Sequence, residues 1–121
     1  MWSDKYIGIP YADMNCGALV NHVMRAEFGI ELNLPVDNSG NIFSNSATIA
    51  NHKDSVAKRI ITPFDGCGVL MLARGRMAHV GVYVAHGAGY VLHAHSGFKT
   101  SICQPIESLR DVIIEGFYQW I

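Results

Sequence analysis

The sequence predicts an α+β domain in which a helix near the N-terminus packs on an antiparallel β-sheet. Apolar residues recur with the spacing of an amphipathic helix over residues 16–28. The second half of the chain instead contains short apolar runs with strand-like alternation, separated by glycine-containing turns. A chain of 121 residues can bury one hydrophobic core, and no linker or internal repeat divides it. Residues 1–121 are therefore expected to form a single domain.

The expected helix has favourable signals at both ends. Asn15 suits the N-cap, because its side-chain oxygen can accept a hydrogen bond from the free N–H groups of the first turn. Gly29 suits the position just after the helix, where the backbone often turns left-handed. The apolar stripe consists of Cys16, Leu19, Val20, Val23, Met24 and Phe28. His22 falls on the polar side, where we expect it to be solvated.

Two stretches show weaker periodicity. Residues 1–14 are expected to be irregular, with a turn around Gly8-Ile9-Pro10. Residues 33–59 are polar, and within them Ser46 to Lys58 predicts a short helix that buries a few apolar residues. This polar stretch is a candidate for one wall of a cleft.

The second half predicts the strands of the sheet. We expect strands over residues 69–72, after a turn at 63–66, and over 79–85, 90–95, 100–103 and 112–120. Over residues 79–85 the side chains divide between two faces, with Val80, Val82 and Val84 on one and His79, Gly81 and Tyr83 on the other. Gly81 leaves space on the His79 face for a packed helix end or a substrate backbone.

Composition limits the function classes. The net charge of −1 gives no electrostatic basis for binding nucleic acid or an anionic membrane. No apolar run approaches the roughly 20 residues that span a bilayer, and the start of the chain lacks the layout of a signal peptide. We therefore expect a protein that is cytoplasmic as synthesised. Three cysteines without paired spacing argue against a disulfide framework, and Cys67 and Cys103 are interpreted as apolar fillers.

Cys16 and His79 are the candidate nucleophile and general base. Cys16 follows the helix N-cap, where the helix dipole lowers a thiol pKa and backbone N–H groups can stabilise an oxyanion. His79 opens a strand and does not share a face with the three valines, so its ring is available for chemistry. The alternative interpretations are a buried core cysteine and a capped histidine at a strand edge.

A third residue that orients His79 is expected on the next strand. His93 and His95 share one face of that strand, so periodicity does not separate them. Four of the six histidines fall between His79 and His95, so a metal site is an alternative for this region. Zinc sites usually need three or four ligands with local pairing, and no second recognised pair accompanies His93-Ala94-His95. No metal and no other cofactor is therefore expected.

At these motifs the chain resembles the NlpC-type cell-wall cysteine peptidases, a branch of the papain-like fold. The three segments that carry the resemblance are Asn15-Cys16-Gly17-Ala18-Leu19-Val20, His79-Val80-Gly81-Val82-Tyr83 and Val91-Leu92-His93-Ala94. Flanking segments are similar to the phage tail branch: Gly8-Ile9-Pro10-Tyr11, Phe28-Gly29-Ile30-Glu31-Leu32, Gly68-Val69-Leu70-Met71 and Ile114-Glu115-Gly116-Phe117-Tyr118. The resemblance covers nearly the whole chain.

The resemblance implies a catalytic set of Cys16, His79 and His93, with His93 favoured over His95. It also implies hydrolysis of an amide in the peptidoglycan stem peptide, commonly the bond from D-glutamate to the diamino acid. Tyr11 and Asn15 would line the oxyanion or substrate region. Phage tail proteins are the implied partners, and a virion tail or delivery to the periplasm is the implied destination.

The chain departs from the family pattern in three places. Asn15 replaces the usual Asp before the cysteine, the stretch from Tyr11 to Cys16 is short, and Gly66-Cys67-Gly68 replaces the usual Gly-Asp. Three alternatives to the peptidase stay open: a non-catalytic tail or structural module with the same fold, an amidase for another substrate, and a metal-binding module.

Overall fold

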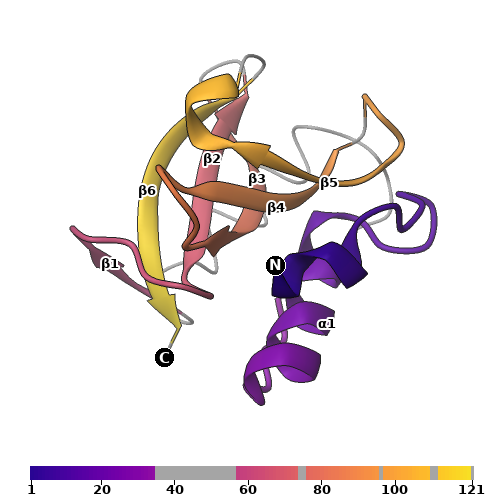
Figure 1. The fold of residues 1–121 in the computed structure, drawn as a ribbon, viewed down its shortest axis with the longest axis horizontal. Coiled ribbons are helices and arrows are strands. Elements are labelled where there is room, and N and C mark those ends of the chain that lie inside the picture. Colours follow the sequence, from indigo (N-terminus) through magenta and orange to yellow (C-terminus); the bar gives the residue numbers. More distant parts are fainter. Residues whose placement is uncertain (35–56, 74–75, 96, 110–111, 121) are drawn as a thin grey trace.

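The computed structural model describes residues 1–34, 57–73, 76–95, 97–109 and 112–120 (Figure 1). A 3₁₀ helix, η1 (Trp2–Tyr6), precedes the helix α1 (Cys16–Phe28). The strands are β1 (Ala57–Ile60), β2 (Gly68–Ala73), β3 (Arg76–Val84), β4 (Tyr90–His95), β5 (Thr100–Pro105) and β6 (Ile113–Trp120), with a short 3₁₀ helix, η2 (Ile106–Ser108), before β6. The prediction of one main helix followed by strands is confirmed.

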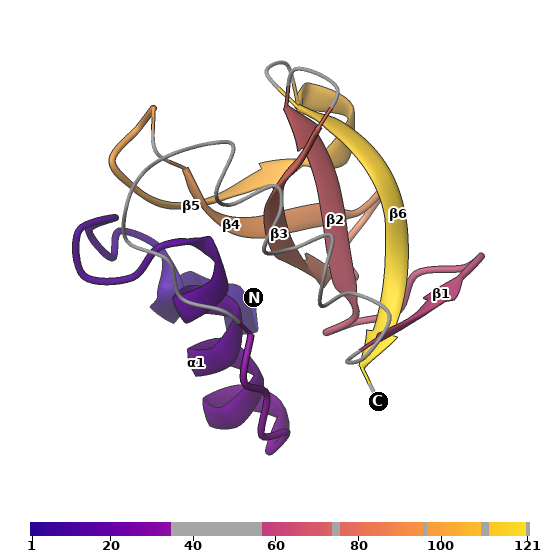
Figure 2. The same ribbon diagram turned by 180° about the vertical axis from the view of Figure 1, so that it is seen from behind.

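The strands form a single antiparallel sheet in the order β1-β6-β2-β3-β4-β5. The sheet curls, and β6 curves across it with β1 along the outer side (Figure 2). Helix α1 packs against β3 and β4, whereas η2, the gold coil in Figure 1, lies at the opposite end of the sheet. The α+β class with an antiparallel sheet is therefore confirmed.

Both ends of α1 follow the sequence prediction. The Asn15 side chain accepts a hydrogen bond from the Ala18 N–H at 3.1 Å. Gly29 ends the helix with a φ of 67°, a left-handed conformation that glycine adopts without a steric penalty. The expected stripe points inward, because Leu19, Val20 and Val23 are fully buried.

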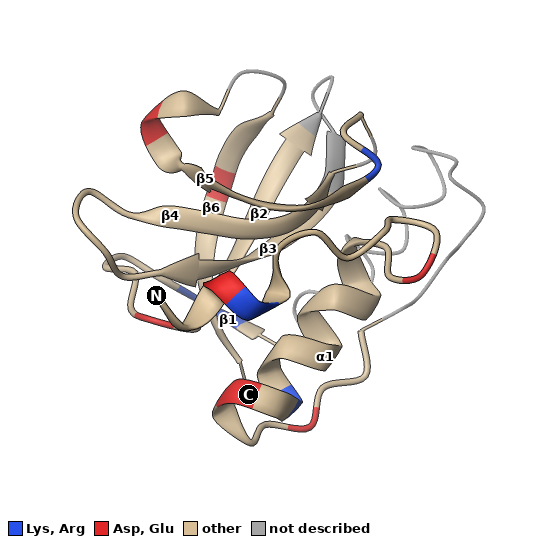
Figure 3. Cartoon of the chain, turned by 45° about the vertical axis from the view of Figure 1, so that its right-hand side comes forward, with Lys and Arg blue, Asp and Glu red and all other residues tan. Residues whose placement is uncertain are grey.

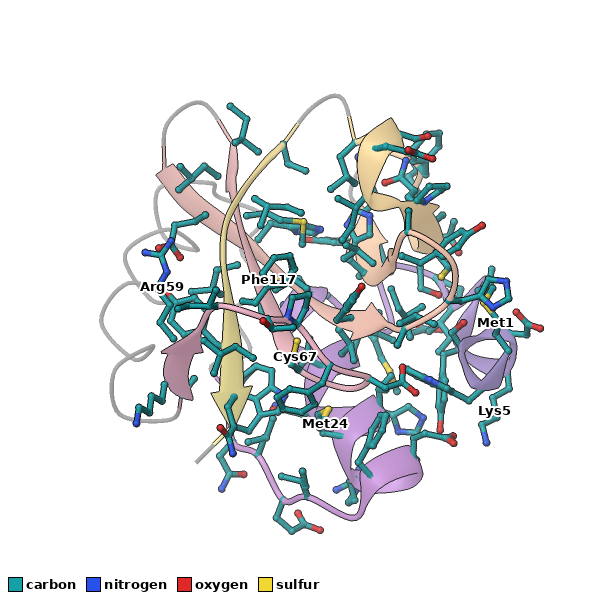
Figure 4. The ribbon with its side chains drawn as sticks, turned by 60° about the vertical axis from the view of Figure 1, so that its left-hand side comes forward. Met1, Lys5, Met24, Arg59, Cys67 and Phe117 are labelled. Atoms are coloured by element: carbon teal, nitrogen blue, oxygen red, sulfur yellow. The ribbon has the colours of Figure 1, made fainter. Side chains whose placement is uncertain are left out.

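The sheet has two apolar faces. The helix face packs on α1 and carries Val80, Val82, Val84, Leu92 and Ala94. The opposite face, called here the far face, carries Cys67, Val69, Met71, Tyr83 and Val91, with Phe117 packed against them. Figure 4 labels Met24 on α1 and Cys67 and Phe117 beside β6. The predicted alternation of residues 79–85 between two faces is thus confirmed, and both faces are covered.

The expected helix from Ser46 to Lys58 is wrong at its end. Ala57 and Lys58 lie in β1 and pair with Trp120 and Gln119 of β6, while the earlier part of that segment lies outside the described residues. The prediction missed β1 because the strand is only four residues long and its partner is the last strand of the chain.

The N-terminal segment is more ordered than the sequence suggests. The Gly8 N–H donates to the Ser101 carbonyl at 3.0 Å, and the Ser101 N–H donates to the Ile9 carbonyl at 2.9 Å. The Tyr11 N–H donates to the Lys99 carbonyl at 2.9 Å. This segment therefore covers the open edge of β5, which would otherwise expose unpaired backbone groups.

His22 also differs from its prediction. Its side chain is half-buried rather than fully solvated, because the ring packs edge-on against Tyr6 with centroids 5.7 Å apart.

Candidate active site

The Cys16 side chain lies at the junction between α1 and the sheet. Cys16 is the first residue of α1 and is only 6% exposed. Backbone groups of Val80, Gly17 and Cys16 itself favour its thiolate and lower its pKa. The thiol therefore lies near main-chain dipoles of the helix N-terminus and of β3.

The contact with Val80 follows from the way β3 and β4 separate. Their pairing runs from Val84↔Tyr90 to Val82↔Leu92 and does not extend to Val80. The Tyr83 N–H donates to the Cys67 carbonyl before β2, so even-numbered residues of β3 direct their N–H groups toward β4. The Cys16 thiol therefore meets the Val80 N–H where a β4 partner would otherwise lie. We call this place the strand gap.

Burial changes the expected electrostatics of the thiol. It raises the pKa of Cys16 above its ordinary value, and the three backbone N–H groups oppose that rise only in part. The sequence-based expectation of a lowered thiol pKa is therefore not met in this structure. The reason is that a thiolate loses its hydration in this apolar junction.

His79 and His93 form a close pair. His79 Nε2 and His93 Nδ1 lie 2.6 Å apart, and the two rings meet edge to face. The other ring nitrogen of His93, Nε2, lies 2.8 Å from the side-chain oxygen of Gln104. His93 is fully buried, so this chain of contacts accounts for both of its ring nitrogens.

Gly81 allows the two histidines to approach. A Cβ at residue 81 would lie 2.9 Å from the Leu92 carbonyl oxygen and 3.1 Å from the His93 Cβ. The space predicted beside Gly81 is therefore filled by β4 and its histidine, and the expected helix end or substrate backbone does not occupy it. Gly81 is therefore a positioning residue. The sequence predicted that its missing side chain leaves space, but not that β4 fills that space.

Both imidazoles are electrically neutral at neutral pH. Burial lowers the pKa of His79 well below its ordinary value, and His93 and His95 lower it further. Burial also lowers the pKa of His93 to about 4, although its contact with Gln104 acts in the opposite direction. Neither β4, β5 nor residues 16–24 of α1 contain Lys, Arg, Asp or Glu, as the tan colour in Figure 3 shows. These three segments therefore place no formally charged side chain at the site.

The Cys16 thiol and the imidazole pair belong to different faces of the sheet. Cys16 belongs to the apolar cluster of the helix face. His79 is the cross-strand partner of Met71, a far-face residue, and such partners share a face. No hydrogen bond joins the Cys16 thiol to the His79 ring among the described side chains. His79 Nε2 faces His93, which leaves Nδ1 as the nitrogen for a thiol or substrate.

The structure distinguishes His93 from His95. His95 Nδ1 accepts from the Gly97 N–H at 3.0 Å and from the Phe98 N–H at 3.3 Å. Its ring lies 6.4 Å from that of His79, centroid to centroid, compared with 4.8 Å for His93. The nitrogen contact with His79 is therefore made by His93, and His95 packs beside the pair.

Tyr11 and Asn15 have separate roles near the thiol. Burial raises the pKa of the half-buried Tyr11 phenol, and a charge on Cys16 would raise it further. Tyr11 is thus within electrostatic range of the thiol despite the short connection. Asn15 caps α1 through Ala18, so it positions the first turn from which Cys16 projects.

The other two cysteines lie elsewhere. Cys67 is fully buried in the far-face core, and the Cys103 sulfur lies 3.7 Å from the Ser3 hydroxyl. Burial raises the pKa of both thiols. Within the described ranges, no group of three or more His, Cys, Asp or Glu side chains is arranged to hold a metal ion.

Gln104 is the residue of this site that the sequence analysis missed. It follows Ile102 by two positions on β5, and Ile102 is the cross-strand partner of His93. Its only signal in the sequence is that it shares a strand face with Ile102. That signal points to His93 only when the register of β4 with β5 is known.

Comparisons with family models, curated proteins and solved structures gave no match. Among the described residues, no helix has both the length and the apolar character needed to cross a membrane. A function for this chain therefore has to be inferred from its own residues and geometry.

Proposed function

We propose that this protein is an NlpC-type, papain-like cysteine peptidase that hydrolyses an amide of the peptidoglycan stem peptide. The observation that carries the proposal is that a helix-terminal thiol lies beside Val80 and that the neighbouring residue of the same strand begins a histidine pair. The Cys16 sulfur lies against the backbone of Val80, and the adjacent residue, His79, contacts His93 at 2.6 Å. A nucleophile, a base and an orienting group are the parts that acyl transfer requires.

In the proposed reaction His79 Nδ1 takes the thiol proton while the Cys16 sulfur attacks the substrate carbonyl carbon. In this proposal the Cys16 N–H at the helix N-terminus donates to the resulting oxyanion. The C–N bond then breaks, and His79 returns the proton to the departing amine. A water molecule activated by His79 hydrolyses the thioester and restores the thiol.

The raised pKa of the thiol and the lowered pKa of His79 define the resting state. Both groups favour their neutral forms, so the enzyme rests as a thiol and a neutral imidazole. The thiol proton then moves from Cys16 to His79 only when substrate is bound. The thiolate–imidazolium pair therefore exists only in the reacting complex.

The resemblance supplies the substrate class, the bond from D-glutamate to the diamino acid, and a phage tail as the setting. Muropeptides should be cleaved by the wild-type protein in the presence of EDTA, and mass analysis should find a new free amine on the diamino acid. Cys16→Ser should fold and be inactive, because the hydroxyl has a far higher pKa than the thiol. Activity that disappears with EDTA and returns with zinc would instead support the metal-binding alternative.

A second candidate is a non-catalytic tail module that retains the fold. The low exposure of Cys16 favours it, because a nucleophile needs access to substrate. A folded wild-type protein that cleaves no muropeptide and whose Cys16 resists iodoacetamide would support this alternative. An amidase for another substrate would show rapid Cys16 labelling without muropeptide cleavage.

A further inference from the structure

The far face carries a line of three polar side chains in contact with one another, and His95 packs beside them. His79 on β3, His93 on β4 and Gln104 on β5 are connected by contacts of 2.6 and 2.8 Å. Gln104 is itself partly buried and pairs with Val91 of the far-face cluster. Buried polar atoms need hydrogen-bond partners, so the proton positions along this line are coupled.

We infer that Gln104 is a positioning residue that fixes the tautomers of His93 and His79 so that His79 Nδ1 carries a lone pair. When the Gln104 oxygen faces His93 Nε2, that nitrogen must donate, and the proton of neutral His93 therefore sits on Nε2. His93 Nδ1 is then an acceptor, and His79 Nε2 must donate to it. The remaining nitrogen of His79, Nδ1, is consequently free of a proton and can take one from a thiol.

The opposite orientation of the Gln104 amide would have the reverse effect. Its NH₂ group would donate to His93 Nε2, and His93 Nδ1–H would donate to His79 Nε2. The proton of neutral His79 would then lie on Nδ1, and that nitrogen could not act as a base. The orientation of the Gln104 side-chain amide therefore decides whether His79 Nδ1 can act as a base.

The surroundings restrict the His93 ring. His93 is fully buried, and β4 lies so close to Gly81 that a Cβ there would be 3.1 Å from the His93 Cβ. The ring is therefore held in one position, and a change of tautomer cannot be relieved by reorientation. The catalytic consequence rests on the proposed function, whereas the tautomer assignment does not.

The test is long-range ¹H–¹⁵N NMR of the substrate-free protein with labelled histidines. In the wild type, His79 and His93 should both be Nε2–H tautomers. Gln104→Glu places an obligate acceptor at the same position when ionised and should preserve both tautomers. Gln104→Leu removes the acceptor and should give His93 a mixed or Nδ1–H tautomer. Gln119→Leu, on the exposed surface of β6, is the matched control and should change neither.

Activity provides a second, separable measurement. Gln104→Leu should lower kcat for muropeptide cleavage by about 10- to 100-fold with a smaller effect on KM, since it changes the population of competent base. Gln104→Glu should retain more activity than Gln104→Leu.

The outcomes separate the two proposals. Wild-type Nδ1–H tautomers, or tautomers unchanged in Gln104→Leu, would overturn the inference even if the enzyme is active. Nε2–H tautomers that depend on Gln104 in a protein without hydrolase activity would support the inference and count against the proposed function. If Gln104→Leu does not fold, the wild-type tautomers and Gln104→Glu still decide the question.

Discussion

The two sides of the sheet around β3 and β4 hold their functional groups by different means. On the helix face the Cys16 thiol is positioned by backbone N–H groups within an apolar cluster. On the far face the His79 ring is positioned by other side chains, from His93 to Gln104. Backbone N–H groups remain when a neighbouring side chain is substituted. In a series of side-chain contacts, by contrast, substitution of any one residue removes the support of the next. The positioning residues of the far face should therefore be more sensitive to substitution than those of the helix face.

The largest expected effect is on the far face. His79→Ala should reduce muropeptide cleavage by at least about 10⁴-fold, and His93→Ala by about 10²- to 10⁴-fold, because an orienting residue does not itself transfer the proton. His95→Ala should cost less than His93→Ala, since His95 directs its Nδ1 to the backbone of residues 97 and 98. Initial rates at saturating and limiting substrate provide the measurement. A crippled His95→Ala with a normal His93→Ala would assign the orienting role to His95.

Acid should destabilise the far face through His93. Its pKa is about 4 in the folded protein, below the ordinary value of 6.5. The unfolded state therefore binds the proton more readily, and the stabilisation is complete above pH 6.5 and lost as the pH falls toward 4. A shift of this size corresponds to about 3 kcal/mol, and the lowered pKa of His79 acts in the same direction.

Urea unfolding between pH 4 and 7.5 measures this dependence. His93→Gln should flatten the stability profile across that range. His86→Gln, on the exposed turn after β3, should leave the slope of the wild type unchanged. An identical slope in His93→Gln and wild type would contradict the assignment of the effect to His93.

A smaller effect is expected from the close approach of β3 and β4. Gly81→Ala should lower the free energy of unfolding by about 1–3 kcal/mol, because the added methyl group forces β4 away. The same displacement should weaken the contact between His79 and His93 and lower activity beyond the loss of stability. Chemical denaturation measures the first effect, and the histidine ¹⁵N shifts measure the second. Ala85→Ser, at an exposed position just after β3, should alter neither.

The smallest effect is expected on the helix face. Asn15→Ala removes the side-chain acceptor of the Ala18 N–H and should cost about 1 kcal/mol in the free energy of unfolding. Asn15→Asp should restore that stability, since a carboxylate caps the first turn and interacts favourably with the helix dipole. Thermal unfolding of the three proteins compares them. Equal stability of Asn15→Ala and wild type would show that the backbone alone fixes this turn.

The helix face could be predicted from sequence because its signals are local. The cap at Asn15, the inward stripe and the stop at Gly29 all fall within fifteen residues of one another. The alternation of side chains along β3 is also a local signal. It correctly predicted that His79 and Val80 lie on different faces of the sheet. The sign of the Cys16 pKa shift was not predictable in this way, because it depends on what buries the thiol.

The far face could be predicted only in part. Its histidines were identified, but periodicity did not choose between His93 and His95. That choice depends on the register of β3 with β4, and the role of Gln104 depends on the register of β4 with β5. The strand β1 and the pairing of residues 8–11 with β5 were missed for the same reason, since their partners are remote in sequence.

The position of β6 has a consequence for how this protein is made. β6 lies between β1 and β2 in the sheet, although β1 ends at Ile60 and β2 at Ala73, long before β6 begins at Ile113. During synthesis β1 therefore has no strand partner until β6 has left the ribosome. Contacts between such distant segments close slowly. Until β6 is made, we expect the edge of β2 that pairs with β6 to stay unpaired. The nascent chain should therefore be most prone to aggregate before β6 joins the sheet.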